Sequence, residues 1–133
     1  NYISAPVPII HTKDFEKHSL NHEVNIDFLK WIKHTFPNVK IYYIVRDGRN
    51  VVSSIINKVW GHSQTVSEYR INLQEASSQW NEVINKTWDW AQENCEIVRY
   101  EDYSTLVSNP LSNEEVALAT PLLKENLRKT GYL

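Results

Sequence analysis

This chain of 133 residues has few of the features that mark several protein classes. Its single cysteine, Cys95, cannot form an intrachain disulfide and has no ligand partners at zinc-site spacing, so we expect no metal site. Fourteen basic against sixteen acidic residues give a formal net charge of −2, unlike the strongly basic balance of nonspecific binders of nucleic acid or membrane surfaces. No stretch approaches the roughly 18 consecutive apolar residues of a membrane span. Any binding of anions must therefore be local.

Methionine is absent and glycine is scarce. Because the sequence starts at Asn1 and has no methionine, we expect it to be the C-terminal part of a longer domain. Apolar side chains, by contrast, are plentiful: 41% of the residues are hydrophobic, with five Trp and seven Tyr, which suffices to bury a core. Residues 1–133 are thus expected to form a single domain. A lone cysteine is compatible with a reducing compartment such as the cytoplasm.

Apolar periodicity predicts alternating helices and strands. A helix is expected over about 21–35, ended by Pro37. Residues 39–45 are almost continuously apolar, the pattern of a strand covered on both faces in a parallel sheet. After the turn at Asp47 and Gly48, apolar residues recur at helical spacing. The polar face of this helix carries Asn50, Ser53, Ser54 and Asn57.

The second half of the chain continues the alternation. A long amphipathic helix is expected from about 64 to 93, and a short strand from 96 to 100. Ser112 begins a capping box with the glutamate three residues later, Pro121 is expected to start a further helical segment, and Gly131 to stop it. This order predicts an α/β fold with a parallel sheet flanked by helices.

Several anion-binding groups stand at the carboxyl end of the predicted strand 39–45. Ligands of parallel α/β sheets lie beyond the carboxyl ends of the strands, beside helix N-termini. Arg46 stands there, its guanidinium matches two phosphate oxygens, and the N–H groups that begin the next helix favour an anion. Ser54 adds a hydroxyl from the polar face of that helix. These donors predict a phosphate-sized pocket; alternatively, Arg46 pairs with Asp47 or Asp102 and the serines face water.

Two later segments strengthen a resemblance that begins at this strand mouth. YYIVRDGRNVVSS is similar to the 3′-phosphate-binding segment of sulfotransferases that use 3′-phosphoadenosine 5′-phosphosulfate (PAPS), where a strand ends in arginine and a serine follows eight residues later. The RYEDY and SNP segments also resemble bacterial-type members, so the resemblance covers roughly residues 8–110. It implies a P-loop-NTPase-like fold and PAPS as cofactor. It further implies that Arg46 and Ser54 hold the 3′-phosphate, that Arg49 assists them, and that Tyr100 contacts the adenine.

The resemblance also implies roles for two residues near the transferred sulfuryl group. In HTKD, Lys13 would balance charge on the bridging oxygen and His11 would be a general base, unless they are a surface lysine and a histidine that caps the strand. The C-terminal LRKTGY is similar to the family's Arg-Lys-Gly phosphate contact, or is simply a helix end with basic residues. The family also has a loop, rich in glycine and in serine or threonine, that binds the 5′-phosphosulfate. None of the three glycines of this chain begins such a loop. We therefore expect the 3′-phosphate and adenine side of the cofactor site alone.

Other residues near this site have structural interpretations. Glu101 and Asp102 are expected to pair with Arg46, Arg49 or Arg99 and to orient them. Cys95 is interpreted as a buried small residue rather than a nucleophile.

Three functions are compatible with these patterns. The leading hypothesis is a PAPS-dependent sulfotransferase that moves a sulfuryl group to a hydroxyl or amine of a small-molecule or glycan acceptor, which the sequence does not identify. A nucleotide kinase, with RDGR as a lid arginine pair, is the alternative enzyme. A non-catalytic module that docks a partner through the helix at 64–93 is the third, and it predicts an exposed apolar stripe on that helix.

Overall fold

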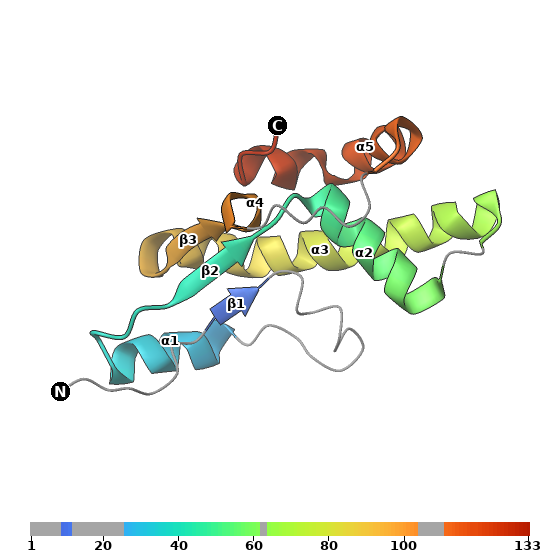
Figure 1. The fold of residues 1–133 in the computed structure, drawn as a ribbon. Helices are drawn as coiled ribbons and strands as arrows, with labels where there is room; N and C mark the ends of the chain where they lie inside the picture. Colours follow the sequence, from blue (N-terminus) through green and yellow to red (C-terminus); the bar gives the residue numbers. More distant parts are fainter. Residues whose placement is uncertain (1–8, 12–25, 62–63, 104–110) are drawn as a thin grey trace.

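The computed structural model describes residues 9–11, 26–61, 64–103 and 111–133 of the chain (Figure 1). Its sheet has three strands in the order β1 (Ile9–His11), β2 (Tyr42–Val45) and β3 (Glu96–Arg99). Both neighbouring pairs are parallel, with Ile44 opposite His11 on one side and Val98 on the other. The predicted parallel sheet is thereby confirmed, and the carboxyl ends of all three strands lie at one edge.

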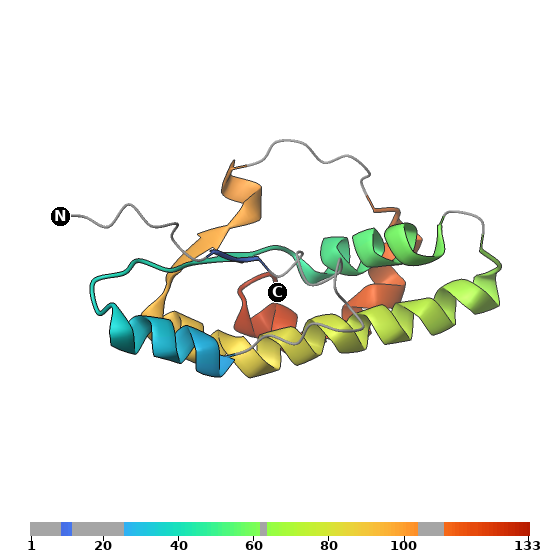
Figure 2. The same ribbon diagram turned by 90° about the horizontal axis from the view of Figure 1, so that it is seen from below.

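In the described ranges, five helices accompany the sheet and make the fold helix-rich: α1 (Ile26–Thr35), α2 (Gly48–Trp60), α3 (Val66–Asn94), α4 (Tyr100–Tyr103) and α5 (Asn113–Lys129). The helices expected after Gly48 and over 64–93 are confirmed as α2 and α3. Helix α1 covers the described part of the helix expected over 21–35. In Figure 2, α1 and α3 run along one side of the strands while α4 lies on the other.

The β2 strand is covered unequally on its two faces. Ile41, Tyr43 and Val45 are completely buried, whereas Tyr42 and Ile44 between them are only half-buried. Within the described residues, the expectation of a strand covered on both faces is therefore wrong. The reason is that the long helix α3 packs on one face: the Tyr43 hydroxyl lies 2.6 Å from the Thr87 hydroxyl, and its ring meets Trp88 edge-on.

Helix α5 runs through Pro121 without a new start, contrary to the sequence expectation. A proline inside a helix removes one hydrogen bond and crowds the preceding turn. Here a continuous buried stripe of Ala119, Leu123 and Leu127 spans the proline. Packing of that stripe offsets the lost bond, because tertiary burial contributes most of a helix's stability. The helix begins at the Ser112 capping box, as predicted.

Candidate functional site

The carboxyl edge of the sheet is formed by the ends of the three strands. Arg46 follows β2, Tyr100 follows β3, and β1 ends at His11. The parallel register places Val45 opposite Arg99, which brings the next residues of the two strands to the same level. This edge is the place where parallel α/β sheets bind ligands.

The Arg46 guanidinium lies over the Tyr100 ring, with its Cζ atom 4.7 Å from the ring centre. Its Nη1 nitrogen is buried and has no hydrogen-bond partner among the residues that the structure describes. A buried charged donor without an acceptor is costly, and guanidinium pairs well with phosphate oxygens. The structure thus brings together two of the predicted site residues and leaves one donor of Arg46 without a partner in the described part of the chain.

Arg49 has a different environment from Arg46. Its Nε and Nη2 atoms donate to the two carboxylate oxygens of Asp47 at 3.0 and 2.8 Å, and the hydrogen bonds with Asp47 raise the pKa of Arg49. Asp47 also caps α2 by accepting the Arg49 backbone N–H at 3.0 Å. The alternative in which Arg46 takes Asp47 as its partner is thus not what the structure shows, because Arg49 occupies both oxygens.

Gly48 lets the first turn of α2 sit directly on Trp80. A Cβ atom at Gly48 would lie 2.7 Å from three carbon atoms of the Trp80 indole, closer than real contacts allow. Trp80 itself is 1% exposed, so the ring has no room to give way. This contact sets the position of the β2–α2 turn relative to α3, and thereby the position of the Arg46 backbone.

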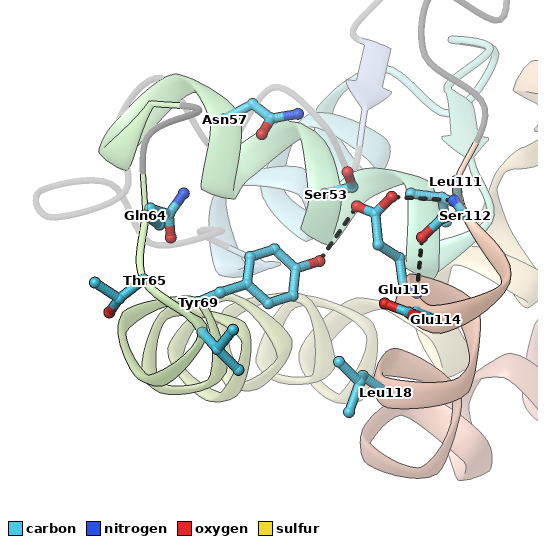
Figure 3. Close-up of a pocket in the computed structure, with 11 residues that line it drawn as sticks. Ser53, Asn57, Gln64, Thr65, Tyr69, Leu111, Ser112, Glu114, Glu115 and Leu118 are labelled. Atoms are coloured by element: carbon cyan, nitrogen blue, oxygen red, sulfur yellow. Dashed lines mark hydrogen bonds between the residues drawn. The ribbon is translucent and has the colours of Figure 1, made fainter.

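The four polar residues of α2 are all half-buried, in agreement with a face directed away from the core. Ser53 and Asn57 line a groove of about 540 Å³ between α2 and the N-terminal ends of α3 and α5 (Figure 3). Ser54 is the next residue along the helix, turned by roughly 100° about the axis. Of the two serines, Ser53 thus belongs to the groove, and Ser54 does not line it.

The groove in Figure 3 is acidic rather than anion-binding. Glu114 and Glu115 line it, and the Tyr69 hydroxyl donates to Glu115 at 3.4 Å. Both helices that begin at the groove are capped by their own side chains, Thr65 with Glu68 and Ser112 with Glu115. In both helices the cap side chain accepts the N3 amide, and the negative charge of the two glutamates disfavours a phosphate in this groove.

Glu101 does not have the role that the sequence suggested. Its two carboxylate oxygens accept the Asp47 backbone N–H at 2.9 Å and the Tyr132 hydroxyl at 2.5 Å. The Arg99 guanidinium likewise contacts Tyr132: its Cζ atom lies 4.9 Å from the centre of the Tyr132 ring. Tyr132 was not recognised in the sequence, although Gly131 before it was correctly read as the helix stop.

The remaining predicted residues are placed as follows. Lys13 and the SNP segment lie outside the described residues, as does the side chain of His11, although its backbone pairs with Ile44. In LRKTGY, Arg128 and Lys129 are exposed on α5. Cys95 is half-buried, and burial raises the pKa of its thiol to about 11, so it is a poor nucleophile. In the part of the chain that the structure describes, no three His, Cys, Asp or Glu residues form a metal-binding group.

The comparison with known families identifies the chain. The model of the sulfotransferase family matches residues 10–113, which include the β2–α2 turn and RYEDY. The chain belongs to the sulfotransferase family. Neither the curated proteins nor the solved structures give a significant match.

Family membership supports a general role in sulfotransfer and favours it over a nucleotide kinase. The docking-module interpretation loses its main support, because the apolar stripe of α3 is buried: its members include Leu73, Trp80, Ile84 and Trp88. Among the described residues of this sulfotransferase-family chain, no helix has the length and apolar character needed to span a membrane.

Proposed function

We propose that this sulfotransferase-family chain provides the 3′-phosphate and adenine side of a PAPS site. The parent activity would be transfer of a sulfuryl group to a hydroxyl or amine of a small-molecule or glycan acceptor. The observation that carries this proposal is the buried Nη1 of Arg46 at the carboxyl edge of the sheet, which has no partner within the described ranges of the chain. A phosphate oxygen at that position would remove the cost of the unpaired donor.

Each residue has a distinct role in this proposal. Arg46 binds the 3′-phosphate. Ser54 donates a hydrogen bond from its hydroxyl to the same phosphate, from the side of α2 that does not line the groove. Tyr100 supports the guanidinium through its ring and borders the adenine. Asp47 already caps α2, so the helix terminus contributes less to the anion than the sequence suggested. Arg49 stabilises the turn by neutralising Asp47.

The catalytic side is proposed from the sequence and the sheet order. PAPS, when bound, supplies the sulfuryl group and a nucleotide as leaving group. His11 ends the strand beside β2 and is therefore at the edge where the acceptor must approach. We assign it the removal of the acceptor proton, and assign Lys13 the balancing of charge at the bridging oxygen.

Calorimetry with 3′-phosphoadenosine 5′-phosphate tests the cofactor proposal. Arg46→Ala should weaken binding by roughly ten- to a hundredfold, because a charge-assisted hydrogen bond is lost. Arg70→Ala removes an exposed arginine on α3 and is the matched control, with an expected change below about twofold. ATP, which has no 3′-phosphate, should compete weakly. Unchanged affinity in Arg46→Ala would overturn the assignment.

A further inference from the structure

The end of α5 brings the chain back to the carboxyl end of β2. Gly131 has a φ of 85°, its N–H donates to the Arg128 carbonyl, and the Tyr132 N–H donates to the Leu127 carbonyl at 2.7 Å. These bonds form a Schellman motif, which reverses the direction of the chain. A Cβ atom at Gly131 would lie 2.7 Å from the guanidinium of Arg99. Glycine therefore permits both the turn and the close approach of Arg99.

This turn brings Tyr132 against the carboxyl edge of the sheet. Its hydroxyl donates to Glu101 Oε1 at 2.5 Å and, more weakly, to the Val45 carbonyl at 3.3 Å. Burial, and then the hydrogen bond to Glu101, raise the pKa of the Tyr132 phenol well above its usual value. The hydroxyl therefore remains a donor at neutral pH.

Glu101 completes the arrangement on the other side of Arg46. Its Oε2 atom accepts the Asp47 backbone N–H at 2.9 Å. The Val45 carbonyl and the Asp47 amide are the backbone groups directly before and after Arg46. Tyr132 and Glu101 thus bind the backbone on both sides of Arg46, whose own Nη1 has no partner in the described part of the structure.

We propose that Tyr132 and Glu101 are positioning residues that act together as a backbone clamp on Arg46. The clamp fixes the direction in which the Arg46 side chain leaves the strand, so that its guanidinium meets a 3′-phosphate. The inference rests on the proposed function, because it deepens the account of the same site. The clamp contributes to discrimination between nucleotides with and without a 3′-phosphate.

The first test compares two nucleotides in one titration series. Adenosine 3′,5′-bisphosphate and adenosine 5′-monophosphate differ by the 3′-phosphate alone, so the ratio of their affinities isolates its contribution. Tyr132→Phe should reduce this ratio about five- to tenfold while the monophosphate affinity stays the same. Tyr69→Phe removes another tyrosine–glutamate hydrogen bond, in the groove between α2, α3 and α5, and should leave the ratio unchanged. A ratio unaffected by Tyr132→Phe contradicts the clamp.

Substitutions of Glu101 separate positioning from charge. Glu101→Ala should lower the ratio as Tyr132→Phe does. Glu101→Gln should keep the affinity ratio of the unsubstituted chain, because the amide oxygen still accepts the Asp47 N–H and the amide nitrogen donates to Tyr132. Glu125→Ala removes an exposed carboxylate of α5 and is the matched control. If Glu101→Gln behaves like Glu101→Ala, the charge of Glu101 matters rather than its hydrogen bonds, and the clamp is wrong.

Amide hydrogen exchange tests the clamp without any ligand. The Asp47 amide should exchange at least about fivefold faster in Tyr132→Phe and in Glu101→Ala than in the unsubstituted chain. Unchanged exchange overturns the clamp whatever the nucleotides do. If the unsubstituted chain does not distinguish the two nucleotides, the proposed 3′-phosphate site fails, and the exchange of Asp47 still decides the clamp.

Discussion

Arg46 and Tyr100 face each other across two neighbouring strands, with the guanidinium carbon 4.7 Å from the centre of the ring. Each residue directly follows its strand, so the parallel register of β2 and β3 produces the contact. The ring supports the charge from one side without using its hydrogen-bond donors. The Nη1 donor of Arg46 has no hydrogen-bond partner among the described residues, which the sequence could not reveal.

Replacing Tyr100 should therefore weaken nucleotide binding through Arg46. A cation–π contact contributes about 0.5–2 kcal/mol, so Tyr100→Leu should lower the affinity for 3′-phosphoadenosine 5′-phosphate roughly two- to thirtyfold. Tyr100→Phe keeps an aromatic face and should stay within about twofold of the unsubstituted chain. Calorimetry at one salt concentration measures both. Equal binding by Tyr100→Leu and the unsubstituted chain would show that the ring does not support Arg46.

Arg49 should matter for stability more than for binding. Its guanidinium is paired with Asp47 at 2.8 Å, so Arg49→Gln should change nucleotide affinity by less than about threefold. Asp47→Ala removes both this partner and the N-cap, and should lower the free energy of unfolding by about 0.5–2 kcal/mol. Asp47→Asn retains the cap and should cost less. Urea titrations give the stabilities; a large affinity loss in Arg49→Gln would instead make Arg49 a ligand-binding residue.

The elements around Arg46 could be predicted because their signals are local. An apolar run, a turn at Asp47 and Gly48 and a helical repeat follow one another within twenty residues. The structure confirms the strand over Tyr42–Val45 and the helix, which already begins at Gly48. The same holds for the Ser112 capping box, whose partners are three residues apart. Local hydrogen bonds and periodicity depend little on the rest of the fold.

The interactions of the site depend on tertiary structure and could not be predicted. Sequence proximity allowed Asp47 to pair with either neighbouring arginine, and only the helix geometry selects Arg49. Tyr132 reaches Val45 across 87 positions of sequence, through a turn that no local pattern connects to β2. The continuity of α5 through Pro121 likewise follows from buried packing, which outweighs the helix-breaking tendency of proline.

Gly48→Ala should destabilise the chain although alanine favours helices. The gain in helix propensity is about 0.5–1 kcal/mol. The new Cβ atom, however, would lie 2.7 Å from the buried Trp80 ring, and overpacking of this kind costs about 1–3 kcal/mol. Urea unfolding should therefore show a net loss of stability. Combining Gly48→Ala with Trp80→Phe should cost less than the sum of the single changes, and strict additivity would indicate that the two residues do not collide.

Tyr43 should make the stability of the chain fall in alkaline solution. Burial raises the pKa of its phenol from 10.0 to about 12, and the hydrogen bond with the Thr87 hydroxyl lowers it by less. The unfolded chain thus loses the phenolic proton from about pH 10, while the folded chain keeps it until about pH 12. The stabilisation is complete below pH 10 and is lost as pH rises through 12, with a slope of up to about 1.4 kcal/mol per pH unit. Tyr43→Phe should remove this share of the slope in urea titrations between pH 9 and 12. Identical pH dependence in the two proteins would mean that Tyr43 titrates normally in the folded state.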